Sequence, residues 1–193
     1  MAKIYKIGFT RPAMIRELVL VAQVHVDSKN WEETEEKISA MNLLQSRTKR
    51  SEKILFDELK GRLMRLNQDQ MELIAEDHRS DVNQLSWIAV CKQYPFVADF
   101  VQEVVQPAVM SGRNMIDYDD YGYFFNSKAD LHPELDAVSD KTRSNARGAL
   151  FQMLRQCELL SDSNHFITQI ISTALQNCTP QSELDLIPGA IRL

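Results

Sequence analysis

The sequence predicts an all-α protein of two packed helical subdomains, the C-terminal one helix-turn-helix-like with a short wing as one interpretation of its tail. Apolar residues recur at helical spacing along most of the 193 residues. Glycine and proline are scarce, at six each, which favours long helices over a turn-rich β architecture. A hydrophobic content of 44% and a charged content of 25% are typical of a folded globular chain.

The first two helices are predicted from their capping residues. Thr10 as N-cap, with Pro12 in the first turn, predicts an apolar helix over Ala13–His25. Asn30 is expected to cap a second helix over residues 31–42, whose early glutamates suit the positive end of the helix dipole. This explains the acidic cluster without a bound metal.

The segment Asn42–Leu66 combines an apolar stripe with a positive edge, and we interpret it as the central scaffold of the fold. A helix over Thr48–Leu66 places four leucines on one stripe: Leu55, Leu59, Leu63 and Leu66. From Arg47 to Arg65 there are seven Lys or Arg residues against three acids, in a chain of net charge −5. One edge of the helix is therefore expected to pack in the core and the other to contact phosphate.

The middle of the chain continues as helices interrupted by prolines. Asp81 is expected to cap one of them, and Pro95 to break the pattern because the residue before proline disfavours the helical conformation. Pro107 should kink or end the last one before Ser111. The predicted helices cover residues 68–78, 82–94 and 96–105.

Residues 113–130 change character, with three tyrosines, two phenylalanines and four aspartates but no clear periodicity. We predict a packed aromatic and acidic connector between an N-terminal bundle, 1–112, and a C-terminal subdomain, 131–193. Asp117, Asp119 and Asp120 could suggest a calcium loop, but the EF-hand spacing and its terminal glutamate are missing.

The C-terminal pattern is typical of helix-turn-helix recognition: a short helix at 132–138, a turn at Ser139-Asp140 and a long helix at 141–160. No acid occurs between Lys141 and Gln156, and Gly148 on the exposed face suggests close approach of another backbone. Many such units only pack, so this pattern alone does not establish DNA contact. The tail at 161–171 predicts a wing-like hairpin or an extended strand, followed by a helix at 172–178 and an irregular end.

The sequence contains no nucleotide-binding, α/β-hydrolase or zinc-protease signature, so we expect no enzyme activity, no cofactor and no metal site. The three cysteines are far apart and are expected to be reduced thiols. The N-terminus lacks the apolar core of a signal peptide, and no apolar run is long enough to span a bilayer. We therefore expect a cytoplasmic protein without a membrane partner.

The segment NLLQSRTKRSEKILFDELKGRL resembles the BrxA family of bacteriophage exclusion (BREX) defence systems. The similarity continues in order through LSWIAVCKQY, residues 100–104 and SDKTRSNARGALFQMLRQCELL. The resemblance implies a small all-helical, non-enzymatic BREX component with double-stranded DNA binding. It also implies a methyltransferase, a large ATPase and an alkaline-phosphatase-like protein as partners.

The leading hypothesis is a DNA-binding accessory protein that acts mostly through phosphate contacts. The rival is a protein–protein adaptor whose basic strips dock on acidic surfaces of other defence components. A third, a nucleic-acid enzyme, would need an acidic cluster or a His–carboxylate pair in a cleft. Helical geometry gives the candidate DNA-contacting residues: Arg47, Lys49, Arg50, Lys53, Lys60, Lys141, Arg143, Ser144, Asn145, Arg147 and Arg155.

Overall fold

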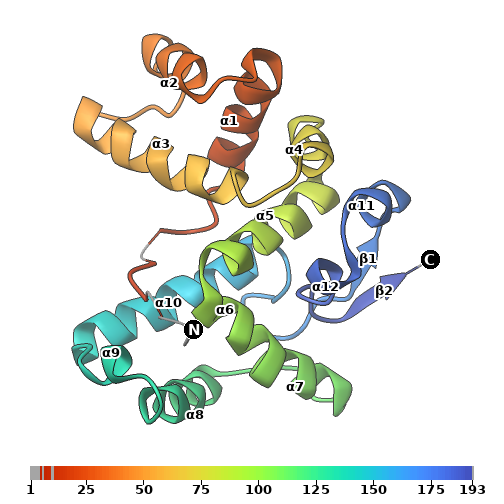
Figure 1. The fold of residues 1–193 in the computed structure, drawn as a ribbon. Coiled ribbons are helices and arrows are strands. Elements are labelled where there is room, and N and C mark those ends of the chain that lie inside the picture. The colour runs from red at the N-terminus through yellow and green to blue at the C-terminus, as the bar shows by residue number, and fades with distance from the viewer. Residues whose placement is uncertain (1–4, 6, 10, 193) are drawn as a thin grey trace.

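The structure, a computed structural model, describes residues 5, 7–9 and 11–192 of the chain. Within these residues helices dominate and a single two-stranded sheet lies near the C-terminus, so the all-α prediction is confirmed (Figure 1). The buried apolar side chains form one contiguous core that extends from Tyr5 to Ile187. The predicted division into two subdomains stays a prediction.

The N-terminal helices are α1 (Ile15–Ser28), α2 (Trp31–Ala40) and α3 (Lys49–Leu63). Thr10, the predicted cap of the first helix, lies outside the described residues. The prediction of a start at Ala13 was wrong: the carbonyls of Pro12 and Ala13 accept hydrogen bonds from the Arg62 guanidinium, at 3.0 and 2.7 Å. The helix begins only after Met14, which adopts a left-handed φ of 54°.

The cap of α2 forms at Asn30, as predicted, and side chains also cap the start of α3. The Asn30 side chain accepts hydrogen bonds from the backbone N–H groups of Glu32 and Glu33, at 2.8 and 3.1 Å. Thr48 and Ser51 form a reciprocal capping box at the start of α3. Both caps satisfy backbone donors that a helix start otherwise leaves unpaired.

The helix at the centre of the fold is α5 (Arg79–Gln93), not α3, which corrects our interpretation of Asn42–Leu66 as the central scaffold. Every residue of α5 from Asp81 to Cys91 is buried, and the helix packs against α1, α3, α4 (Gln68–Ala75) and α10 (Asp140–Gln156). The predicted Asp81 cap is wrong, because Asp77 turns the chain with a left-handed φ of 59° and lets the helix start earlier. Asp81 instead lies in the first helical turn.

A continuous helical path follows Pro95 and includes Pro107. It consists of α6 (Pro95–Phe100), a π-helical turn η1 (Val101–Val105) and α7 (Gln106–Met110). Proline removes one N–H donor and its ring clashes with the carbonyl four residues earlier in a regular α-helix. The wider π turn lies immediately before Pro107 and accommodates it, so the helix ends only at Ser111, before Gly112 with its φ of +79°.

The prediction of a non-helical connector at 113–130 was wrong, since most of it forms α8 (Tyr118–Ala129). The three aspartates that could suggest a calcium loop lie at the start of this helix. Asp117 accepts hydrogen bonds from the N–H groups of Asp119 and Asp120, and Asp120 pairs with Arg113. Tyr121, Phe124 and Phe125 of α8 pack edge-to-face or tilted against Phe96 and Phe100 of α6.

The C-terminal part contains α9 (Pro133–Asp136), α10 (Asp140–Gln156), β1 (Gln169–Ile171), α11 (Thr173–Cys178), α12 (Gln181–Leu184) and β2 (Ala190–Arg192). Ser139 caps α10 as predicted, and α10 ends before the predicted Leu160. The extended-strand interpretation of the tail is confirmed, because β1 pairs in parallel with β2. The expected irregular end was wrong in part, since it contributes β2.

Candidate nucleic-acid interface

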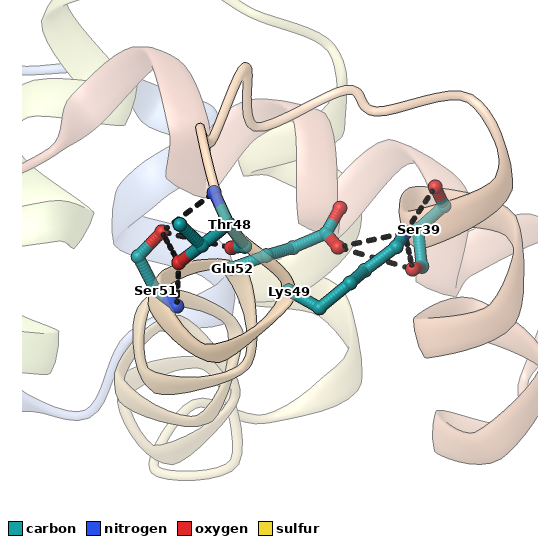
Figure 2. Close-up of polar contacts among 5 residues, drawn as sticks. All are labelled: Ser39, Thr48, Lys49, Ser51 and Glu52. Atoms are coloured by element: carbon teal, nitrogen blue, oxygen red, sulfur yellow. Dashed lines mark hydrogen bonds and ion pairs between the residues drawn. The ribbon is translucent and has the colours of Figure 1, made fainter.

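Lys49 and Lys53, two of the predicted lysines of α3, are engaged by acidic and polar groups of α2 and α3. Figure 2 shows Lys49 reaching from α3 to α2, where its Nζ lies 2.6 Å from Ser39 Oγ and 3.1 Å from Glu52 Oε2. Lys53 Nζ lies 2.7 Å from Glu35 and 2.9 Å from Asp57. Hydrogen bonds to Glu35 and Asp57 raise the pKa of Lys53 above its ordinary value. Much of the positive charge of this strip is therefore compensated within the protein.

The other basic residues of this stretch divide into free and structural ones. Arg47 and Arg50 are exposed and have no side-chain partner among the described residues. Lys60 is half-buried, with its Nζ 5.6 Å from the centre of the Trp31 ring. Arg62, which contributed to the local charge, is fully buried and pairs with Glu58 at 2.9 Å. The net charge of the sequence window thus overstates the charge that α3 offers to a ligand.

Helix α10 presents a polar face to solvent. Exposed residues recur along it at one-turn spacing, and in the described part of the chain none has a side-chain partner: Lys141, Ser144, Asn145, Gly148 and Gln152. A methyl group added at Gly148 would meet no atom within 4 Å, so nothing inside the protein requires glycine there. This face offers an ammonium, a hydroxyl and two amides, which are groups that bind phosphates and base edges.

The three arginines on the flank of α10 are held in place by other side chains. The Arg143 guanidinium lies 4.4 Å from the Phe125 ring centre and that of Arg147 lies 4.5 Å from the Tyr118 ring centre. Arg155 donates twice to the side-chain oxygen of Asn164, at 3.1 and 2.7 Å. Fixed guanidinium groups lose less conformational freedom when they bind a ligand.

The aromatic partners of these arginines were not predicted from the sequence. Tyr118 and Phe125 belong to α8, in the segment that we predicted as a connector. Their contacts with α10 join residues that are separated in the sequence by α9. A helical interpretation of 118–129 would have placed Tyr118, Tyr121 and Phe125 on one face. The helical spacing of these three aromatic residues was the sequence signal that could have indicated the contact with α10.

Two hollows of the surface and a buried thiol lie near α10. A cavity of about 500 Å³ between α1, the start of α5 and the end of α10 contains the paired Arg79 and Glu158 at its rim. A smaller one of about 220 Å³ lies between α8 and α10. Burial raises the pKa of Cys157 to about 12, which keeps this thiol protonated. No group of three or more metal-ligating side chains gathers in the part of the chain that the structure describes.

Fold and site together define a small helical protein whose last long helix exposes a polar face that carries no acid after Asp140. Its fold is similar to that of an uncharacterized protein from Magnetospirillum magneticum, with a TM-score of 0.80 over 97% of this chain and all of the other, at 17% identity. None of the helices from residue 5 onward, where they are described, is long and apolar enough to cross a membrane.

The sequence comparisons identify the family. The BrxA family model matches residues 3–181, nearly the whole chain. The BREX protein BrxA of Escherichia coli O9:H4 (strain HS) is 27% identical over 145 residues, which are 75% of this chain and 68% of that protein. The chain belongs to the BrxA family.

Proposed function

We propose that this protein is a component of a BREX phage-defence system that binds double-stranded DNA, with α10 as the principal contacting helix. Membership of the BrxA family and the similarity to BREX protein BrxA support the place in BREX. The observation that carries the DNA contact is the exposed face of α10, from Lys141 to Gln152, which has polar groups without partners among the described residues. DNA would satisfy these groups.

The structure favours α10 over α3 for the main contact. Lys49 and Lys53 would have to leave Glu52, Glu35 and Asp57 to bind phosphate, and this exchange lowers the net gain. On α3 the groups ready for a phosphate are Arg47 and Arg50. We therefore infer a main contact along α10 and a secondary one at the N-terminal end of α3.

A helix-turn-helix arrangement of α9 and α10 would place the N-terminal half of α10 against the DNA. In such units the start of the second helix contacts base edges while other groups hold the phosphates. Asn145 is the exposed side chain suited to base edges, whereas Lys141 and the Ser144 hydroxyl are suited to phosphate. Arg143, Arg147 and Arg155 flank this face as further phosphate donors, and Lys60 remains a more distant one.

The test is a salt series of duplex binding measured by fluorescence anisotropy. The logarithm of the association constant should fall linearly with the logarithm of salt concentration, by a slope of about −0.9 for each phosphate contacted. Lys141→Gln should weaken binding of all sequences alike and reduce the slope by about 1. The matched control is Lys37→Gln, which removes the same charge from a lysine that already pairs with Glu33 at 2.8 Å.

Two results would contradict the proposal. One is the absence of duplex binding at low salt, and the other is an equal effect of Lys141→Gln and Lys37→Gln. A chain without DNA affinity that still co-purifies with BREX proteins after nuclease treatment would be an adaptor instead.

A further inference from the structure

The pocket between α8 and α10 combines two guanidinium groups with one carboxylate. It has a volume of about 220 Å³. The short helix α9 connects α8 and α10 in Figure 1. The lining residues of the pocket come from both α8 and α10: Tyr121, Gly122, Asp140, Arg143, Ser144 and Arg147. Arg143 and Arg147 are four residues apart, so they lie on the same side of α10.

One hydrogen-bond donor of the arginines that line this pocket has no acceptor. The Arg147 Nε is buried and has no hydrogen-bond partner in the described part of the chain. A buried donor without an acceptor is costly, and such an atom calls for an explanation such as a ligand. The ring of Tyr118 fixes the plane of this guanidinium. Arginine fixed in this way is suited to bidentate binding of phosphate oxygens.

The second arginine is fixed as firmly as the first. Its guanidinium lies over the Phe125 ring and donates a hydrogen bond to the Gly122 carbonyl at 3.1 Å. The Ser144 hydroxyl is exposed at the same pocket and has no partner among the described residues. The pocket thus joins fixed charged donors to a free neutral one.

Gly122 keeps the pocket open from the side of α8. Glycine is a poor residue for a helix interior, so its presence in α8 needs a reason. Packing does not supply one, because an added Cβ would come no closer than 3.9 Å to its nearest neighbour, Arg143 Nη2. A larger side chain at this position would occupy the space in front of that guanidinium.

We propose that this pocket binds one phosphodiester group of the DNA backbone through Arg143, Arg147 and Ser144. Two arginines and Asp140 give the pocket a formal charge of +1, which matches the single negative charge of a phosphodiester better than a phosphate dianion. The inference rests on the proposed DNA binding and adds the place where the backbone is held. A phosphate fixed beside the start of α10 would set the register of that helix on the duplex.

The experiment uses two probes with the full chain: a 16-base-pair duplex and dimethyl phosphate, the smallest phosphodiester. The side-chain Nε–H signal of Arg147 in ¹⁵N-resolved NMR reports directly on the unpartnered donor. It should shift on addition of either probe, and an equal concentration of sodium chloride should not reproduce the shift.

Two variants separate phosphate binding from stability and net charge. Arg147→Lys keeps the charge but loses the planar fork, and it should weaken duplex binding about tenfold. Gly122→Leu changes no charge and introduces a good helix former, yet it should remove one phosphate contact and reduce the salt slope by about 1. A purely structural role of the pocket would leave the salt slope unchanged. Thermal unfolding verifies that both variants fold. If Gly122→Leu does not fold, the shift of the Arg147 Nε–H signal in the wild-type chain decides the outcome.

The outcomes distinguish this inference from the proposed function. If the wild-type chain binds the duplex but both variants match it, the pocket proposal is overturned and DNA binding stands. If the wild-type chain binds no duplex but dimethyl phosphate shifts the Arg147 signal, the phosphodiester pocket stands and DNA binding falls. If neither probe shifts that signal, the pocket proposal is overturned.

Discussion

Replacement of Arg62 by methionine should destabilise the protein strongly although it removes only one of the many charges of α3. The Arg62 side chain is fully buried and donates hydrogen bonds to Glu58, Pro12 and Ala13, at 2.9, 3.0 and 2.7 Å. Methionine retains most of the volume, so packing changes little. It leaves the Glu58 carboxylate and two buried carbonyl groups without their donor.

The magnitude follows from these lost partners. Breaking a buried ion pair by removing one member costs about 3–5 kcal/mol. Glu58 retains 18% side-chain exposure and a hydrogen bond from the Tyr94 hydroxyl at 2.6 Å, so part of its charge stays solvated. We therefore expect the low end, about 3 kcal/mol, which for a chain of this size lowers Tm by roughly 6–12 °C.

The assay is urea unfolding followed by circular dichroism, with Arg50→Met as the control. Arg50 lies on the same helix but is exposed, so its replacement should change the free energy of unfolding by no more than about 0.5 kcal/mol. Glu58→Gln combined with Arg62→Met should recover part of the loss, because the double variant no longer buries an uncompensated carboxylate. A cost below about 1 kcal/mol for Arg62→Met would refute the reasoning.

Three further predictions concern stability. Gly148→Ala should raise the free energy of unfolding by about 1 kcal/mol, because alanine is the better helix former and its methyl group meets open space; an unchanged value would contradict this. Asp117→Ala should lower it by about 1 kcal/mol through loss of the α8 cap, whereas Asp119→Ala, matched in charge, should not. Burial and, to a smaller extent, the charge of Lys60 lower the pKa of His25 from 6.5, so stability should fall as pH drops from 6.5 through this lowered pKa, and His25→Gln should remove that pH dependence.

Helices with a clear apolar stripe or a capping residue could be predicted from the sequence. The sequence did not indicate which helix is completely buried at the centre of the fold. The start of α2 follows from Asn30, whose side chain accepts hydrogen bonds from nearby backbone N–H groups. The central role of α5 was missed because the helix is buried all round and carries no polar face to contrast with an apolar one. Asn83, Gln84 and Ser86 are polar yet buried there.

The residues of the candidate site that lie along α10 could be predicted from the sequence. The contacts between α10 and α8 could not. The spacing of Lys141, Ser144 and Asn145 along one helix is local, so sequence alone places them on one face. Contacts between Arg147 and Tyr118 depend on how two helices pack, which periodicity does not specify. The charge count failed for a related reason, since the sequence does not show that Glu35 of α2 reaches Lys53 of α3.

The net charge of −5 decides how such a protein would bind DNA. Long-range attraction cannot drive the encounter, because the whole molecule carries the same sign as the duplex. Binding must come from short-range contacts within a Debye length, about 8 Å at physiological salt. The acids that compensate Lys49 and Lys53 then favour the surface of α10, where Asp140 is the single acid beside Lys141, Arg143 and Arg147. Stronger binding after Glu35→Gln combined with Asp57→Asn, which removes both carboxylate partners of Lys53, would show that this compensation limits DNA binding at α3.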